Sequence, residues 1–331
     1  YWGIPIPIWR TEDGSEERCI GSVEELHTAC TEAVAAGLMA AHPFPDFVPG
    51  DMSEANYAQI DLHKHVVDGI VLKAADGRPM HRESDLIDVW FDSGSMPYAQ
   101  WHYPFENKDR VDGPDGGLAF PADFIAEGVD QTRGWFYTLH AISTMVFDQV
   151  AYRTVVSNGL VLDKAGQKMS KRLGNAVDPF ETLEQFGPDA TRWYMITNAQ
   201  PWDNLRFDTE GIAEVQRKFF GTLHNTYAFL ALYAGIDGFD PASDAPAVET
   251  RPELDRWILS RLHTCIEEVQ ASFDAFEPTR AGRTIQSFVV DDLSNWYVRL
   301  GRRRFWKSDS DADKSAAYAT LHTCLHTVSV L

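Results

Sequence analysis

Residues 122–136 read ADFIAEGVDQTRGWF, and this stretch decides the predicted fold. Its first part, ADFIAEG, is a short apolar run that ends in glycine and predicts a buried strand. A helix is expected from about Arg133 to Phe147, because apolar residues then recur at helical spacing. The buried face of that helix consists of Trp135, Leu139, Ile142 and Val146. The apolar runs DVWFDSG before this stretch and TVVSNGLVL after it complete a strand, helix and strand pattern, which predicts an α/β fold with a parallel sheet.

The chain divides into three regions with different patterns of secondary-structure signals. Residues 1–85 mix proline-bounded strands with loops, and the pair Asp76-Gly77 signals a hairpin turn, so we expect a connector region there. Residues 86–210 carry the alternating strands and helices. Residues 211–331 are expected to form a helical bundle, because the strand signals stop and long amphipathic patterns begin. The helices of the bundle are expected at about 212–233, 254–272, 280–304 and 313–331.

The composition excludes several classes of protein. Asp and Glu number 49 against 29 Lys and Arg, for a net charge of -20, so unspecific attraction to nucleic acid or to an anionic membrane is not expected. No apolar run is long enough to span a bilayer. The four cysteines are scattered without a CxxC pair, which predicts neither a disulfide framework nor a cysteine zinc site and favours a reducing, cytoplasmic location.

Polar residues follow the predicted strand at 122–128. Glu127, Asp130 and Gln131 lie where the strand ends, and the carboxyl ends of parallel strands are where open α/β sheets bind ligands. Carboxylates there suit ribose hydroxyls or an ammonium group, and Gly128 allows a ligand to approach the backbone. The alternative is that Asp130 or Thr132 caps the helix while Glu127 is solvated.

The stretch KMSKRLGN at residues 168–175 predicts a loop that holds an anion. Two lysines three residues apart on a glycine-flanked loop can follow a triphosphate through a reaction, because each ammonium group is a flexible point charge. An ordinary solvated surface turn is the alternative. The pattern GxxxxGK[ST] is absent, so a Walker-type nucleotide loop is not predicted.

A cluster of basic residues lies in the C-terminal third of the chain. It comprises Arg299, Arg302, Arg303, Arg304 and Lys307, interleaved with Phe305 and Trp306. Arginines beside aromatic residues could neutralise phosphates and stack on bases of an RNA. The competing interpretation is that these cations complement the dipole at the end of a helix.

Several motifs together resemble the isoleucyl-tRNA synthetase family of class I aminoacyl-tRNA synthetases. They are WGIPIP, DVWFDSGSMPYAQWHYPFEN, FPADFIAEGVDQTRGWF, NGLVLDKAGQKMSKRLGN and NWYVRLGRRRFWK, in this order. The resemblance covers the whole chain. It implies the second half of a Rossmann-type catalytic domain, followed by part of a helical anticodon-binding domain.

The resemblance also implies roles for individual residues. Catalysis would rest on Lys168, Ser170 and Lys171 of the signature loop, which would stabilise the α-phosphate and the departing pyrophosphate. ATP or the adenylate would be bound by Glu127, Gly128, Asp130, Gln131, Gly159, Lys168, Met169 and Lys171. The isoleucine pocket would be walled by Trp90, Gln131 and Trp135, although from the residues alone each tryptophan is equally well explained as core. The tRNA would contact Arg299, Arg302, Arg303, Arg304 and Lys307.

The same resemblance implies the substrates and partners. They are ATP with Mg²⁺, isoleucine and tRNA(Ile), and the protein would be a monomer with no membrane association. No metal site is expected, because only Cys19 and Cys30 lie where some members carry a zinc knuckle, and the pair His322 and His326 lacks a third ligand.

The chain departs from the family pattern in two places. A His-x-Gly-His motif is absent, so the chain is expected to be an internal piece of a longer synthetase and to be inactive alone. Arg172 replaces the last serine of KMSKS and adds a third cation. A non-catalytic RNA-binding or regulatory module on the same scaffold is the alternative function, and the intact lysines and EGVDQ segment favour the enzyme.

Overall fold

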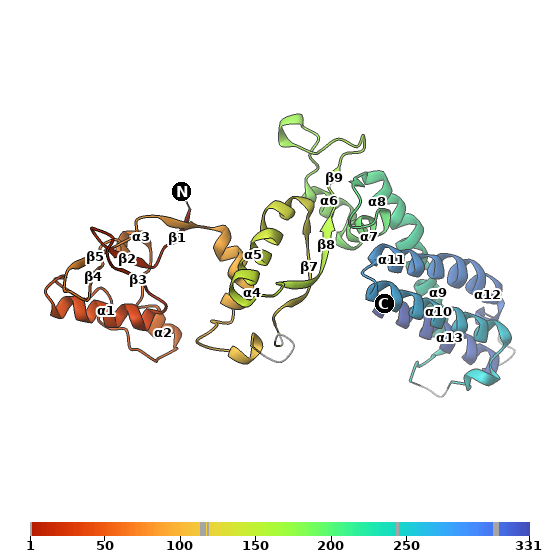
Figure 1. Ribbon diagram of the computed structural model, residues 1–331. Helices are drawn as coiled ribbons and strands as arrows, with labels where there is room; N and C mark the ends of the chain where they lie inside the picture. The colour runs from red at the N-terminus through yellow and green to blue at the C-terminus, as the bar shows by residue number, and fades with distance from the viewer. Residues whose placement is uncertain (1, 113–116, 118, 243–244, 307–310) are drawn as a thin grey trace. The chain divides into compact units, whose positions relative to one another are not determined.

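The computed structural model describes residues 2–112, 117, 119–242, 245–306 and 311–331. Contacts between residues divide the chain into two compact units (Figure 1). The first unit comprises residues 1–124 and 130–154, and the second comprises residues 125–129 and 155–331. The boundaries of these two units differ from those of the three regions expected from the sequence. The division of the chain into those three domains remains a prediction.

The first unit begins with short antiparallel strands. A four-stranded sheet in the order β3-β2-β5-β4 contains β2 (Ile8–Thr11), β3 (Glu17–Cys19), β4 (Val71–Lys73) and β5 (Pro79–Arg82). A separate antiparallel pair joins β1 (Gly3–Pro5) to β6 (Leu86–Asp88). The turn predicted at Asp76-Gly77 connects β4 to β5 and is confirmed. Gly77 has a φ of +90°, which residues with a Cβ rarely adopt.

Three helices accompany this sheet: α1 (Val23–Ala35), α2 (Glu54–Tyr57) and α3 (Lys64–Val67). The hydroxyl of Ser22 caps α1 by accepting a hydrogen bond from the Glu25 amide, and α1 packs against β4. The core is centred on Trp9, whose indole Nε1–H donates to the Ile70 carbonyl at 2.9 Å. This bond satisfies the polar atom of a fully buried indole.

Two helices of the first unit pack directly on each other, namely α4 (Trp90–Ala99) and α5 (Trp135–Phe147). The prediction of a strand in DVWFDSG is wrong, because most of this segment belongs to α4. An oxygen of Asp88 accepts a hydrogen bond from the Trp90 amide at 2.9 Å and stabilises the start of the helix. Gly94 makes the close packing possible, since a Cβ there would lie 2.6 Å from Ile142 Cδ1 and 3.0 Å from the Thr138 carbonyl. The helix predicted at about 133–147 is confirmed as α5. On its predicted buried face, Leu139 and Ile142 are buried, whereas Val146 is 61% exposed and was wrongly assigned to it.

Strands β7 (Ala122–Gly128) and β8 (Tyr152–Asn158) form a two-stranded sheet, so both predicted strands are present. The predicted burial is wrong, because no residue of either strand is buried and Phe124 is 46% exposed. A second sheet joins β9 (Val161–Leu162) to β10 (Leu205–Arg206) in parallel, and β10 was not predicted from the sequence. Helices α6 (Pro179–Phe186) and α7 (Pro188–Asn198) lie between β9 and β10 in the chain. An oxygen of Asp178 accepts from the Phe180 amide at 2.7 Å and begins α6.

The rest of the second unit is a helical bundle, as predicted (Figure 1). Its α-helices are α8 (Thr209–Val215), α9 (Gly221–Asp237), α10 (Glu253–Asp274), α11 (Pro278–Ser287), α12 (Arg299–Trp306) and α13 (Asp311–Val330). Two π-helical segments, η5 (Gln216–Phe220) and η7 (Phe288–Val298), continue the helices on either side of them. The bundle core includes Ile258, Leu262, Val289, Leu293 and Leu321, all nearly inaccessible to solvent. Among the described residues, no helix has the length and apolar content needed to cross a membrane.

Candidate functional site

The segment after β7 begins a short helix, η3 (Val129–Arg133), which leads into α5. Glu127 and Asp130 are exposed, as a carboxylate that meets a ligand must be. The Gln131 carbonyl oxygen Oε1 accepts a hydrogen bond from the Trp135 amide at 2.9 Å, so Gln131 helps to begin α5. Its Nε2 lies 3.3 Å from Asp130 Oδ2. These contacts fix the orientation of the Gln131 amide.

The structure brings the three residues of the predicted amino-acid pocket together within the first unit. Trp135 donates its Nε1–H to the Ser93 carbonyl on α4 at 3.1 Å. A Cβ on Gly134 would lie 2.7 Å from Gln131 Oε1 and 3.5 Å from Trp90 Cη2, so both side chains adjoin this glycine. Trp90 is 45% exposed and Trp135 is half-buried. Trp90 is therefore not a core residue, and part of its ring faces solvent.

The loop after β9 presents three cations to solvent. Lys168, Lys171 and Arg172 are exposed, and none of them forms an ion pair with another described residue. Lys164, in contrast, lies 3.1 Å from Asp208 and 3.0 Å from Glu210, and these carboxylates raise its pKa. The loop thus has one cation tied to the protein and three that are available for an anion.

Gly159 lies where two backbone segments approach closely. Its amide donates to the Pro201 carbonyl at 2.8 Å, and a Cβ would lie 2.2 Å from the Asp203 carbonyl oxygen. The position therefore requires glycine for packing, whatever else the residue contacts.

The predicted basic cluster separates into two groups. Arg299, Arg302 and Arg303 are exposed on α12 and form no ion pair with a described residue. Arg304 is only 16% exposed, because its guanidinium binds both oxygens of the buried Asp255 at 2.7 Å and also pairs with Asp313. Placing Arg304 among the residues free to contact RNA was wrong for this reason. Lys307 lies outside the described residues.

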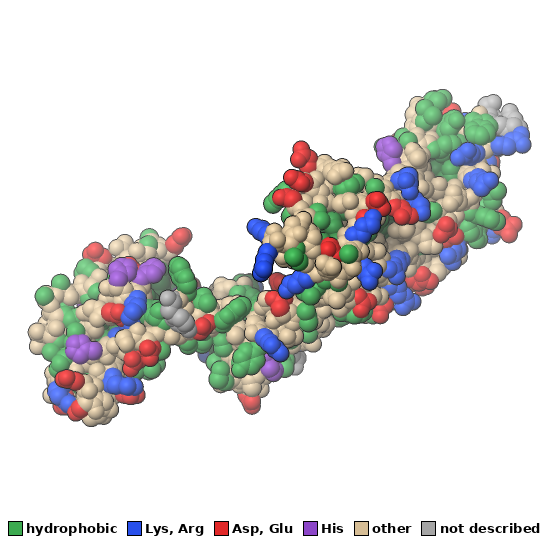
Figure 2. Space-filling model, turned by 90° about the horizontal axis from the view of Figure 1, so that it is seen from above, with side chains coloured by type: hydrophobic (Ala, Val, Ile, Leu, Met, Phe, Trp, Pro, Cys, Tyr) green, Lys and Arg blue, Asp and Glu red, His purple; other side chains and the backbone are tan. Residues whose placement is uncertain are grey.

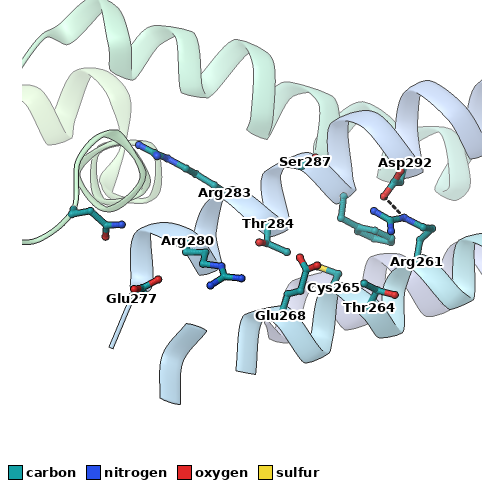
Figure 3. A pocket seen from close by; sticks show the side chains of 12 residues that line it. Arg261, Thr264, Cys265, Glu268, Glu277, Arg280, Arg283, Thr284, Ser287 and Asp292 are labelled. Atoms are coloured by element: carbon teal, nitrogen blue, oxygen red, sulfur yellow. Dashed lines mark hydrogen bonds and ion pairs between the residues drawn. The ribbon is translucent and has the colours of Figure 1, made fainter. Parts of the chain in front are cut away.

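The sequence analysis missed a charged pocket of about 430 Å³ between α10 and α11 (Figure 3). Arg280 points into it toward Glu268, while Arg261 is held by Asp292 at 3.0 Å. Arg283 is anchored by the Thr197 and Asn198 carbonyls at the end of α7. The spacing of Arg280 and Arg283 on one face of an amphipathic helix was the signal that could have found it. On the face that Figure 2 shows, basic and acidic side chains are interspersed.

No group of three or more metal-ligating side chains occurs among the residues that the structure describes.

Comparison with protein families gives two matches. The model of class I tRNA synthetases for isoleucine, leucine, methionine and valine (I, L, M and V) matches residues 1–208, which is more than half of the chain. The chain belongs to the class I tRNA synthetase family. A second model, the anticodon-binding domain of tRNA ligases, matches residues 255–331 of this class I synthetase chain and so covers most of the bundle. The resemblance inferred from the motifs is confirmed.

Curated class I synthetases resemble the chain over its full length. Isoleucine–tRNA ligases from Bacteroides fragilis and Porphyromonas gingivalis are each 64% identical to it over 100% of the chain. The ligase from Thermus thermophilus is 43% identical over the same share. The chain spans about 29% of the length of each of these relatives.

Solved class I synthetases share the fold. The LeuRS–tRNA–LeuAMS complex of Agrobacterium radiobacter superposes with a TM-score of 0.67 at 18% identity, over 99% of this chain and 38% of that one. Methionyl-tRNA synthetase of Mycobacterium tuberculosis, in complex with methionyl-adenylate, gives 0.57 at 20% identity, over 92% of this chain and 58% of that one. The predicted synthetase fold with a helical C-terminal part is confirmed.

Proposed function

We propose that the chain is part of an isoleucine–tRNA ligase. This enzyme joins isoleucine to ATP, forming isoleucyl-adenylate and pyrophosphate, and then transfers isoleucine to tRNA(Ile). The observation that carries the proposal is the KMSKR loop, whose three cations form no ion pair with any described residue, in a chain 64% identical along its whole length to ligases of this name.

The loop cations act on the phosphates. When the isoleucine carboxylate attacks the α-phosphate, negative charge grows on the oxygens of the departing pyrophosphate. Lys168 and Lys171 stabilise this charge, because their ammonium groups are not already neutralised by carboxylates of the described residues. Ser170 acts with the two lysines, Met169 contacts ATP or the adenylate, and Arg172 adds a third positive charge. A Mg²⁺ ion bound with ATP would supply further charge to the phosphates.

The residues at the end of β7 and in the segment that follows it hold the adenylate and the amino acid. Glu127 and Asp130 accept hydrogen bonds from ribose hydroxyls and from the isoleucine ammonium group, and Gly128 lets the adenylate approach the backbone. Gln131 is suited to the same task, since Trp135 and Asp130 hold its amide in one orientation. The indole of Trp90 covers the apolar side chain of isoleucine, and Trp135 forms the adjacent wall. Gly159 is assigned to the adenylate site only through the motif, since its packing already explains the glycine.

The bundle binds tRNA through exposed arginines. Arg299, Arg302 and Arg303 are the candidates for phosphate contacts, because their guanidinium groups face solvent on α12. Arg304 supports the bundle from inside instead. We further propose that the protein works as a cytoplasmic monomer and carries no structural zinc.

A chimeric enzyme tests the proposal. This chain replaces the matching segment of the Bacteroides fragilis ligase, and isoleucine-dependent exchange between ATP and pyrophosphate is measured. The chimera should be active, and Lys171→Ala should lower its rate by about 100-fold or more while leaving the KM for isoleucine little changed. An unchanged rate in Lys171→Ala would remove the loop from the mechanism. Binding of tRNA without any exchange would favour the non-catalytic alternative.

A further inference from the structure

One side chain joins three parts of the signature loop. Asn175 donates from Nδ2 to Asp163 Oδ2 at 2.9 Å and to the Lys168 carbonyl at 3.3 Å. Its carbonyl oxygen Oδ1 accepts from the Ser170 amide at 2.9 Å. The side-chain amide of Asn175 therefore connects the end of the loop to its beginning at Asp163 and to the backbone at Lys168 and Ser170.

Asp163 holds the opposite side of the loop. Its Oδ1 accepts from the Gln167 amide at 2.7 Å, and its own amide donates to the Gln167 carbonyl at 2.9 Å. This closes a tight turn in which Gly166 has a φ of +82°. The hydrogen bond from Asn175, followed by that from Gln167, lowers the pKa of Asp163, which stays ionised as an acceptor. We call Asp163 and Asn175 the loop bracket.

Both lysines extend from backbone that the loop bracket holds. Lys168 is tied through its own carbonyl. Lys171 begins a single turn of helix, η4 (Lys171–Leu173), which Ser170 caps by accepting from the Leu173 amide at 3.2 Å. The cap is positioned in turn by the bond from the Ser170 amide to Asn175. The loop has little apolar packing of its own, since Leu173 is 66% exposed, so these hydrogen bonds determine its shape.

We propose that Asn175 and Asp163 are positioning residues for adenylate formation: they set the spacing at which Lys168 and Lys171 meet the triphosphate. The inference rests on the proposed function of the loop. Neither side chain touches ATP in this scheme. A misplacement of about 1 Å in a charge that stabilises a transition state can cost about 100-fold in rate, so the effect should appear in kcat.

An exchange of the two side chains tests the bracket directly. Asn175→Asp alone places two carboxylates at hydrogen-bond distance and loses both donated bonds. The double variant Asp163→Asn with Asn175→Asp has unchanged net charge and restores a donor and an acceptor across the pair. In that variant the new amide at position 163 can still accept from the Gln167 amide, and the new carboxylate at position 175 can still accept from the Ser170 amide. The 3.3 Å bond to the Lys168 carbonyl is lost, and a carboxylate oxygen faces this carbonyl instead, so the expected recovery is incomplete.

Matched controls come from a second asparagine of the same chain. Asn225 is exposed on α9 and has no side-chain hydrogen bond to a described residue. Asn225→Ala and Asn225→Asp therefore repeat the chemical changes made at Asn175, but at a position on a helix where the side chain does not anchor the signature loop.

In the active chimera, Asn175→Ala and Asn175→Asp should each lower kcat for pyrophosphate exchange by about 10- to 100-fold, with the KM for isoleucine within about twofold. The double variant should recover at least about tenfold over Asn175→Asp, because the two changes are coupled. Both Asn225 controls should match wild type. Near-normal kcat in both Asn175 variants would overturn the proposed positioning role of the loop bracket. A double variant no faster than Asn175→Asp would also overturn it.

Hydrogen exchange of the chain itself separates this inference from the proposed function. Asn175→Ala should speed exchange of the Ser170 and Leu173 amides by about tenfold or more without changing the bundle, and the double variant should restore protection of Ser170. Unaltered exchange in Asn175→Ala would overturn the bracket even if the loop lysines act as proposed. If instead Lys171→Ala leaves the rate unchanged, the proposed role of the loop fails, and the positioning role fails with it, whatever the exchange result.

Discussion

Removal of Arg304 should destabilise the bundle far more than removal of its neighbours on α12. Arg304 binds Asp255 on α10 through Nη1 and Nη2, each at 2.7 Å, and Asp313 on α13 through Nε at 3.0 Å. Asp255 has no solvent exposure and otherwise accepts a hydrogen bond from the Tyr297 hydroxyl at 2.6 Å. The guanidinium therefore joins three helices at a buried carboxylate.

The expected cost follows from what Arg304→Ala leaves behind. Asp255 would remain as a buried anion with a single neutral donor, and breaking a buried ion pair in this way costs about 3–5 kcal/mol in the free energy of unfolding. Arg303→Ala removes an exposed cation without a described partner, so a change within about 0.5 kcal/mol is expected. The double variant Asp255→Asn with Arg304→Met removes both charges and should recover part of the loss.

Hydrogen exchange by mass spectrometry gives the local free energy of opening for peptides of α10 and α13, and urea unfolding followed by circular dichroism gives the global value. Peptides from β2 to β5 serve as an internal control because the first unit does not contain the ion pair. A loss below about 1 kcal/mol in Arg304→Ala, or an equal loss in Arg303→Ala, would refute the reasoning.

Three further predictions concern RNA, catalysis and thiol chemistry. Replacement of Arg299, Arg302 and Arg303 by Ala should weaken tRNA(Ile) binding without lowering the free energy of unfolding. The slope of the logarithm of the binding constant against the logarithm of the salt concentration should fall by roughly one unit per lost phosphate contact, and a slope equal to that of the wild type would exclude these contacts. The 331-residue chain alone should catalyse no isoleucine-dependent pyrophosphate exchange, and robust exchange by the purified chain would contradict this. At pH 8, Ellman's reagent should react rapidly with the exposed Cys19 alone, because the other three cysteines are buried. Burial raises the pKa of the Cys30 and Cys265 thiols to about 11 and the pKa of the Cys324 thiol to about 12. Rapid reaction of two or more thiols in the folded protein would contradict this prediction.

Features that depend on neighbouring residues could be predicted from the amino-acid sequence. The turn at Asp76-Gly77 and the long helices of the bundle follow from local preferences and from periodicity over one or two turns. The loop motif and the segment EGVDQ also stand out without a structure, because their residue types and order are unusual. These local signals were enough to identify the family.

Features that depend on distant partners could be established only from the three-dimensional contacts. The apolar run in DVWFDSG suits a strand or a helix. The helix is favoured by the close packing of Gly94 against α5 and by the hydrogen bond from the Trp90 amide to Asp88. Arg303 and Arg304 are adjacent and chemically identical, yet one faces solvent and the other binds Asp255, far away in the chain. The physical reason is that the energy of a charge depends on its burial and on its partner, and neither of these is encoded within the few residues around it.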